Sequence, residues 1–133
     1  MNPNETFKVV YNASYGGFGL NKSALAEYNR RSSKNVKFND SIDRTDTVLV
    51  DMVETMGNTI NETYSKLKVK EFPIKYKSFL WWNEYDGNEL VKVDYDKYII
   101  HHIKCVKDNN SITAEEKIKQ IQELYDEYDM RPK

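Results

Sequence analysis

The sequence predicts an α+β fold, a small and mainly antiparallel sheet of three to five strands packed by two or three helices on one face. Three observations support this class. Apolar residues repeat at the helical period from Val48 to Ile60, whereas residues 66–72 alternate between charged and apolar side chains, as a half-buried strand does. Asp86-Gly87 is a dipeptide favoured in two-residue β-hairpin turns. With 133 residues, the chain is expected to form a single domain over residues 1–133.

Two helices are expected in the N-terminal half, each with a residue that can cap it. Asn21 is predicted to cap a helix over residues 22–31. Asp46 is predicted to cap the segment with the clearest helical period. Gly57 is expected to end that second helix before a further short turn, because glycine accepts the backbone conformation found at helix C-termini.

Four segments are rich in strand-forming residues and are bounded by turn signals. They are residues 7–13, 66–72, 74–85 and 89–94. Each of the last three follows directly on the one before it, so we expect them to form an antiparallel meander.

The C-terminal region combines one ambiguous segment with one clear helix. Residues 98–106 are predominantly apolar, and their pattern is compatible with a strand or with a short buried helix. Thr113 and Glu116 have the spacing of a capping box, which predicts a helix over about 113–129. The apolar stripe of that helix is narrow, so it can pack on the sheet or pair with a second copy of the chain.

Composition excludes several classes of protein. The formal net charge of −1 gives no global reason to bind nucleic acid or acidic membranes. The single cysteine excludes an intrachain disulfide and indicates a reducing compartment. The first five residues are polar and no stretch approaches 20 apolar residues, so we expect neither a secretory signal nor contact with a membrane.

A glycine cluster between the first strand and the first helix is the strongest local signal of a site. Its spacing lacks the P-loop pattern, and Lys22 stands where a dinucleotide fingerprint needs glycine or alanine. A weaker hypothesis remains, an anion bound at the loop amides and the helix start. The candidate residues are Gly16, Gly17, Gly19, Asn21 and Lys22. We favour a structural turn in which Tyr15, Phe18 and Leu20 fill the core.

Other groupings of reactive residues favour structural roles. His101, His102 and Cys105 are too few for a closed zinc site, and the apolar neighbours of Cys105 indicate an inert core thiol. Arg44 is expected to pair with a carboxylate of the sheet, for instance Glu84. We therefore predict no catalytic residue, no metal ligand and no cofactor.

Two alternatives stay open from the charged residues. Acidic residues near Arg44 and the hairpin could hold Mg²⁺ in a hydrolase or nuclease. They are Asp40, Asp43, Asp46, Asp51, Glu84, Asp86 and Glu89. Lysines between 66 and 77 alternate with apolar and aromatic residues, as on a sheet that stacks single-stranded nucleic acid. Ordinary half-buried strands show the same alternation, so we disfavour a nucleic-acid partner.

Several motifs together resemble a family of small uncharacterised proteins from large DNA viruses of the marseillevirus type, phages and some bacteria. The motifs are Tyr11-Asn12-Ala13-Ser14-Tyr15-Gly16-Gly17-Phe18-Gly19-Leu20, Arg44-Thr45-Asp46, Ser65-Lys66-Leu67-Lys68-Val69, Phe72-Pro73 and Glu84-Tyr85-Asp86-Gly87-Asn88-Glu89. The resemblance covers about residues 7–93, which leaves the C-terminal helix as an extension. It implies a viral context but no catalytic residue.

These observations lead to one expected function. We expect a non-enzymatic viral accessory or virion-associated protein that acts through protein–protein contacts. Its expected partners are a second copy of the chain and a viral or host protein, and its expected location is the virion or the host cytoplasm. A small-ligand module at the glycine loop is the alternative.

Overall fold

The computed structural model describes residues 4–132 and confirms the α+β class. Residues 1–3, which include most of the polar N-terminal segment, lie outside the described residues. The chain divides into two compact units. The first contains the chain up to Lys77 together with Trp81–Lys92, and the second contains Ser78–Leu80 and the chain from Val93 onward. Compactness does not establish independent folding, so a single domain over 1–133 stays a prediction.

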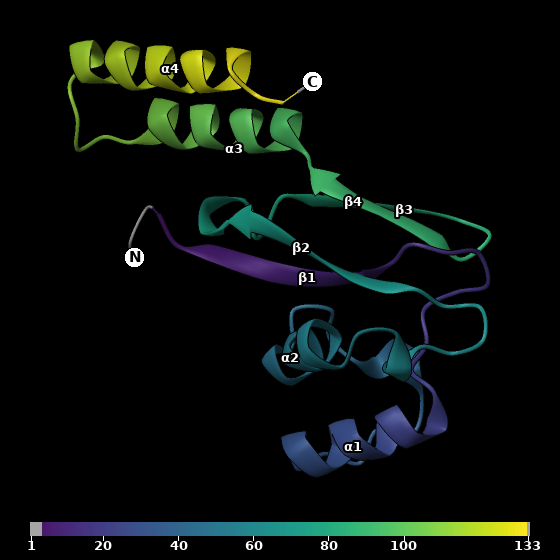
Figure 1. Ribbon diagram of the computed structural model, residues 1–133. Coiled ribbons are helices and arrows are strands. Elements are labelled where there is room, and N and C mark those ends of the chain that lie inside the picture. Colours follow the sequence, from purple (N-terminus) through teal and green to yellow (C-terminus); the bar gives the residue numbers. More distant parts are fainter. Residues whose placement is uncertain (1–3, 133) are drawn as a thin grey trace. The chain divides into compact units, whose positions relative to one another are not determined.

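The first unit is built on a two-stranded antiparallel sheet. Strand β1 (Thr6–Asn12) pairs with β2 (Leu67–Pro73), and this register places Phe7 opposite Phe72 and Val10 opposite Val69. Helix α2 (Thr47–Met56) packs against this sheet, and α1 (Lys22–Ser32) packs against α2 (Figure 1). One helix, α2, therefore covers this face of the sheet directly, and α1 forms a further layer on α2.

Both faces of β1 are buried. Val9 and Val10 are adjacent, so their side chains point to opposite faces of the sheet, and both are fully inaccessible to solvent. Val10 joins the core that α1 and α2 contribute. That core also contains Leu20, Tyr28, Leu49, Met52, Val53 and Ile60. The apolar helical period recognised in the sequence is thus the face that packs on the sheet.

The predicted caps are present. Asn21 Oδ1 accepts the Ala24 amide at the start of α1, and Asp46 Oδ1 accepts the Val48 and Leu49 amides at the start of α2. Gly57 ends α2 at a φ of 58°, and a 3-10 turn (Gly57–Ile60) follows.

The predicted three-stranded meander is wrong. Strand β2 pairs with β1, while β3 (Leu80–Tyr85) pairs with β4 (Asn88–Val93) in a separate sheet. Residues Ile74–Tyr76, expected within a long strand, form a 3-10 turn directly after Pro73. This turn buries Tyr76, so the aromatic residue that suggested a strand instead belongs to the core. The Asp86-Gly87 turn is confirmed, with φ values of 52° and 86° that match a type I′ hairpin.

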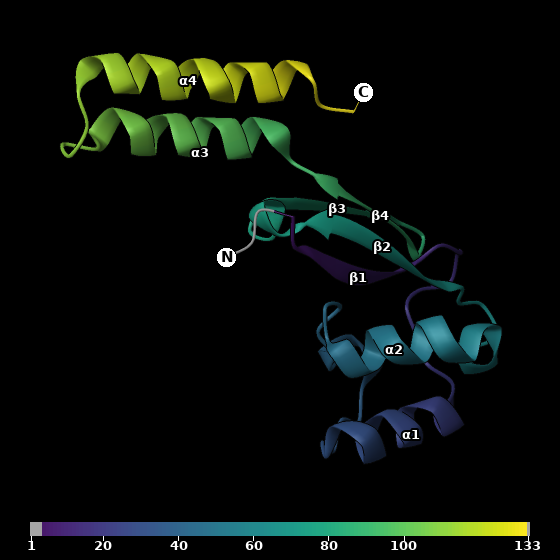
Figure 2. The same ribbon diagram turned by 60° about the vertical axis from the view of Figure 1, so that its left-hand side comes forward.

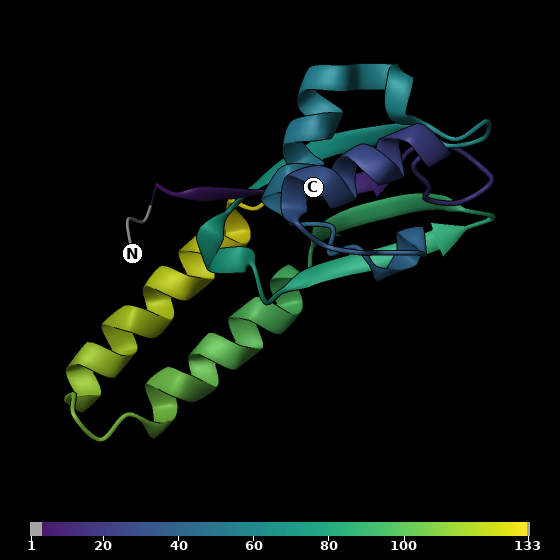
Figure 3. The same cartoon turned by 90° about the horizontal axis from the view of Figure 1, so that it is seen from below.

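The second unit contains a pair of helices. Residues 98–106 belong to helix α3 (Tyr95–Asp108), so the ambiguous segment is helical. Helix α4 (Ala114–Asp129) begins at its predicted cap, where Thr113 Oγ1 accepts the Glu116 amide. The two helices run antiparallel and stay side by side when the view is turned (Figures 2 and 3). Helix α4 therefore packs on α3, a partner that the sequence did not predict.

Candidate functional site

The turn of the β3–β4 hairpin packs against the glycine loop, the segment that contains Gly16, Gly17 and Gly19. The Gly16 amide donates to the Asp86 carbonyl at 2.9 Å. A Cβ atom on Gly87 would lie 2.0 Å from the Gly17 nitrogen and 2.7 Å from two Gly16 backbone atoms. Gly16 and Gly17 adopt φ values of 110° and 98°, which L side chains rarely accept. Gly87 is required because two backbone segments meet here without room for its side chain, whereas Gly16 and Gly17 are favoured by their φ values.

The Asn12 side chain holds the glycine loop and the hairpin turn together. It is fully buried, and its Nδ2 donates to the carbonyls of Ser14 at 2.7 Å and Gly87 at 2.8 Å. Its Oδ1 accepts the Lys66 amide at 2.8 Å. One side chain thus joins β1, the hairpin turn and the segment before β2. This role could not be predicted from the sequence, since a buried asparagine has no distinctive local pattern.

Arg44 and Glu89 form an ion pair beside Asn12. Arg44 Nη1 lies 2.5 Å from Glu89 Oε1, and the two side chains are only 21% and 14% exposed. Glu89 Oε1 also accepts the Asn12 amide at 2.7 Å, while the guanidinium carbon lies 3.6 Å from the Phe18 ring centroid. Pairing of Arg44 with the sheet is confirmed, but the suggested partner Glu84 is wrong. Glu84 instead accepts the Gly87 amide within the hairpin turn.

A hollow of about 380 Å³ lies on the other side of the glycine loop. It is lined by Gly16, Gly17, Phe18, Gly19, Asn39, Glu62, Thr63, Tyr64 and Ser65. Three of the five residues predicted to bind an anion line it, whereas Asn21 and Lys22 lie at the start of α1. The Asn21 side chain is engaged there, as its Nδ2 donates to the Thr59 carbonyl at 2.7 Å. Anion binding stays a prediction, and the Glu62 carboxylate in the lining acts against it.

The three residues of this loop that were expected to fill the core differ in how far they are buried. Leu20 is 1% exposed and belongs to the core, and Phe18 packs against it. Tyr15 is 58% exposed, so its predicted place in the core is wrong. Its ring instead meets Tyr85 edge-on at 6.4 Å between centroids.

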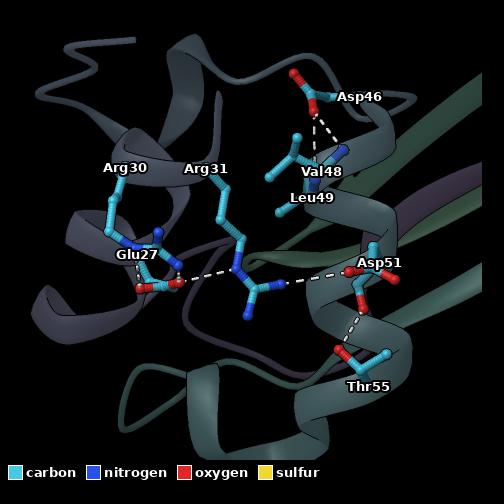
Figure 4. A network of polar contacts seen from close by, with 8 residues as sticks. All are labelled: Glu27, Arg30, Arg31, Asp46, Val48, Leu49, Asp51 and Thr55. Atoms are coloured by element: carbon cyan, nitrogen blue, oxygen red, sulfur yellow. Dashed lines mark hydrogen bonds and ion pairs between the residues drawn. The ribbon is translucent and has the colours of Figure 1, made fainter. Parts of the chain in front are cut away.

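The acidic residues around Arg44 have separate structural partners. Asp43 accepts the Thr45 amide and hydroxyl, bonds that lower the pKa of Asp43. Asp46 caps α2, and Asp51 pairs with Arg31 of α1 at 3.3 Å (Figure 4). The side chain of Asp40 lies outside the described residues. Within residues 4–132, no group of three or more His, Cys, Asp or Glu side chains is arranged to hold a metal ion.

The surface of α1 carries the most strongly charged network. Hydrogen bonds from Arg30 and Arg31 lower the pKa of Glu27 to about 2. Arg31 bridges Glu27 and Asp51, so it links α1 to α2 (Figure 4). This network is explained by helix packing and leaves no reactive group poised for chemistry.

The apolar residues that alternate with the lysines of β2 belong to the interior. Leu67 is 7% exposed and Val69 packs against the core. They therefore offer no stacking platform for bases. Trp81 and Trp82 on β3 are 37% and 39% exposed, and Lys92 lies 4.6 Å from the Trp81 ring centroid.

Cys105 is exposed, so its predicted place in the core is wrong. Its Sγ lies 3.6 Å from His101 Nε2, one helical turn away on α3. Tyr98 is the buried member of this region, and burial, followed by the nearby Glu127 carboxylate, raises the pKa of Tyr98 to about 12. Its ring meets Phe79 edge-on at 5.3 Å. These contacts anchor α3 rather than build a nucleophile.

The α3–α4 pair leaves several apolar side chains exposed. None of the residues of α4 is buried. Ile100 on α3 is 55% exposed, and Ile118 and Tyr125 on α4 are 70% and 52% exposed. We call these three residues the hairpin stripe. The sequence predicted a narrow apolar stripe on the helix over about 113–129, whereas no pattern singled out Ile100.

The hydrogen bond from the Tyr128 hydroxyl to Asp96 Oδ1 indicates that the stripe lies on one side of the pair. Ile100 lies one turn beyond Asp96, and Tyr125 lies one turn before Tyr128. Ile118 lies two turns before Tyr125 on the same side of α4. The three exposed apolar residues thus lie on one side of the helix pair.

The chain matches no protein-family model, no curated protein and no solved structure. Among the described residues, no helix is both long and apolar enough to cross a membrane.

Proposed function

We propose that this protein is a non-enzymatic viral accessory or virion-associated protein that works by protein–protein assembly, and that its first partner is a second copy of the chain. The exposed hairpin stripe supports this proposal most directly. Helices gain most of their stability from packing an apolar face. On α4, Ile118 and Tyr125 of that face remain exposed although α3 lies beside the helix.

The stripe favours a second copy of the chain as the protein that covers it. Two antiparallel helix pairs that bury their apolar faces against each other form a four-helix bundle. Because every copy carries the same stripe, a two-fold axis lets each stripe cover the other and closes the assembly at two chains. Burial of such residues contributes about 1.5–3 kcal/mol for each fully covered side chain.

The test measures the mass of the full chain in solution by light scattering over a range of concentrations. We expect a mass twice that of the 15.7 kDa chain. Ile118→Glu combined with Tyr125→Glu should give a monomer, because two carboxylates cannot be buried without partners. Leu90→Glu is the matched control, since Leu90 is also half-exposed but lies on β4. A monomeric wild-type chain contradicts the proposal.

The viral context rests on the resemblance of the sequence motifs to proteins of large DNA viruses. We propose the virion and the host cytoplasm as locations, and a viral or host protein as a further partner. Immunodetection in purified particles and in cytoplasmic fractions tests this, and absence of the protein from both contradicts it.

A small ligand in the hollow of the glycine loop is the second candidate. The observation that favours it is the volume of about 380 Å³ lined by three of the predicted loop residues. Thermal unfolding with phosphate and nucleotides is the measurement. Stabilisation that increases in Glu62→Gln supports an anion, because that variant removes the opposing charge, and no shift with either ligand rejects the site.

A further inference from the structure

Helix α3 carries a histidine and a cysteine one turn apart on a face that is exposed to solvent. His101 and Cys105 have the i, i+4 spacing at which two side chains of one helix can hold a zinc ion. Both residues are exposed, and Cys105 Sγ lies 3.6 Å from His101 Nε2. The sequence indicates an inert core thiol, whereas an exposed thiol beside an imidazole is within reach of a metal ion.

The distance between these two atoms fits a tetrahedral metal site. Zinc binds a thiolate sulfur at about 2.3 Å and an imidazole nitrogen at about 2.0–2.1 Å. At a tetrahedral angle of about 109°, these bond lengths place the sulfur and the nitrogen about 3.5–3.6 Å apart. A square-planar ion such as Cu²⁺ would require about 3.1 Å between the same two atoms. The observed 3.6 Å therefore favours a tetrahedral ion, and zinc is the ion that Cys and His commonly hold in that geometry.

One chain supplies only two of the four ligands of a structural zinc site. The neighbouring His102 is half-buried, and its ring packs on Tyr98 at 4.3 Å and on Phe79 at 5.8 Å between centroids. Cys105 is the single cysteine of the chain. Within residues 4–132, no third His, Cys, Asp or Glu side chain completes a metal-binding group with this pair. The site is therefore incomplete in a single chain.

We propose that zinc binds between two copies of the chain, held by His101 and Cys105 of one copy and by the partner subunit's His101 and the partner subunit's Cys105. A two-fold axis through the ion repeats the pair and gives a Cys2His2 set, which structural zinc sites use. The two thiolates balance the charge of the ion, and the two thiol protons are released to solvent. This inference rests on the second copy proposed above, but it does not require the hairpin stripe to be the contact between the copies.

Zinc titration of the full chain tests this inference, with the thiol kept reduced. A chelator first removes any bound metal, and zinc uptake is then followed by isothermal titration calorimetry and native mass spectrometry. We expect one zinc ion for every two chains, carried by a dimer. Cobalt in place of zinc should give the intense visible bands of a tetrahedral site and a thiolate-to-cobalt charge-transfer band, because two of its four ligands are thiolates.

Variants of the two ligands and of their neighbour sharpen the test. Cys105→Ser and His101→Gln should each abolish stoichiometric zinc uptake and the cobalt bands. His102→Gln is the matched control, since it removes the other histidine and keeps both ligands, so it should bind zinc as the wild type does. Circular dichroism verifies that α3 is formed in each variant. One ion for each single chain, or uptake that Cys105→Ser retains, overturns the inference.

The outcomes also separate this inference from the proposed function. A metal-free chain that is already a dimer but takes up no zinc overturns only the zinc site. A metal-free monomer that dimerises when zinc is added supports the zinc site and overturns the stripe as the contact that holds two copies together. A chain that stays monomeric with and without zinc contradicts both proposals.

Discussion

At the scale of single residues, Gly87 is the glycine where an added Cβ atom would make the closest contacts. Its φ of 86° is rarely adopted by L residues, and a Cβ atom would overlap backbone atoms of Gly16 and Gly17. We expect Gly87→Ala to destabilise the fold by about 2–4 kcal/mol, because neither backbone segment can move without breaking other bonds. Urea unfolding followed by tryptophan fluorescence measures this loss.

Gly17→Ala is the matched control for that substitution. Gly17 has a similar φ of 98°, but no atom lies within 4 Å of a Cβ built there. It should therefore lose only the backbone term, about 1 kcal/mol. Equal losses in the two variants would show that the close approach of the hairpin turn contributes nothing.

Glu89 is the second residue whose role can be measured directly. Glu89→Ala leaves the largely buried Arg44 guanidinium and the Asn12 amide without their shared acceptor, so we expect a loss of about 2–4 kcal/mol. Glu89→Gln retains an oxygen for the Asn12 amide and should lose less. The free energy of unfolding in urea provides the comparison. Glu84→Ala, which removes one bond within an exposed turn, should lose under about 1 kcal/mol, and a larger loss there than at Glu89 contradicts this assignment.

The ion pair between Arg44 and Glu89 shows which contacts can be predicted from residue types and which cannot. An arginine among carboxylates predicts an ion pair, and the sheet was correctly expected to supply the acid. The choice of Glu89 over Glu84 depends on the hairpin turn docking on the glycine loop. Asn12 controls that docking, and it interacts with residues more than 50 positions away in sequence. No local pattern encodes such a contact.

At the scale of elements, the cap of α2 predicts a specific acid sensitivity. Burial raises the pKa of Asp46, but bonds from Tyr28, Lys34 and the Leu49 and Val48 amides outweigh it and lower the pKa below the usual 3.8. A group whose pKa is lower in the folded state stabilises the fold above its unfolded pKa. That contribution is lost as the pH falls from about 4 through the folded pKa.

Asp46→Asn tests this cap because an amide oxygen can still accept the helix amides but does not titrate. We expect the variant to lack this part of the stability decrease below pH 4, as measured by urea unfolding at several pH values. Asp51→Asn is the control, since Asp51 lies on the same helix with a side chain 62% exposed. An unchanged pH profile in Asp46→Asn contradicts the assignment.

Some structural elements are determined by residues close to them in sequence, and others depend on distant segments. The caps at Asn21, Asp46 and Thr113 and the Asp86-Gly87 turn depend on neighbours in sequence, so each was predictable. Pairing of β1 with β2 joins segments separated by both N-terminal helices, and alternation within β2 says nothing about its partner. Residues 74–76 alternate as a strand would, yet the chain turns there after Pro73.

At the scale of the whole molecule, the two units differ in how they are stabilised. The first unit buries a core on both faces of a sheet, whereas α4 in the second unit has no buried residue. Segments with few buried contacts open more readily than core segments. Stability in α3 and α4 should therefore depend on whatever covers the hairpin stripe.

This difference predicts a concentration dependence confined to one unit. If a second copy covers the stripe, amide hydrogen exchange in α3 and α4 should slow as protein concentration rises, because only the dimer protects these helices. Exchange in β1 and α2 should not change, since their core is complete within one chain. Hydrogen–deuterium exchange with mass spectrometry at two concentrations measures both regions at once, and the Ile118→Glu, Tyr125→Glu chain should show fast exchange in α4 at both. Equal protection of α4 at all concentrations in the wild type would mean that one chain stabilises the helix without a partner.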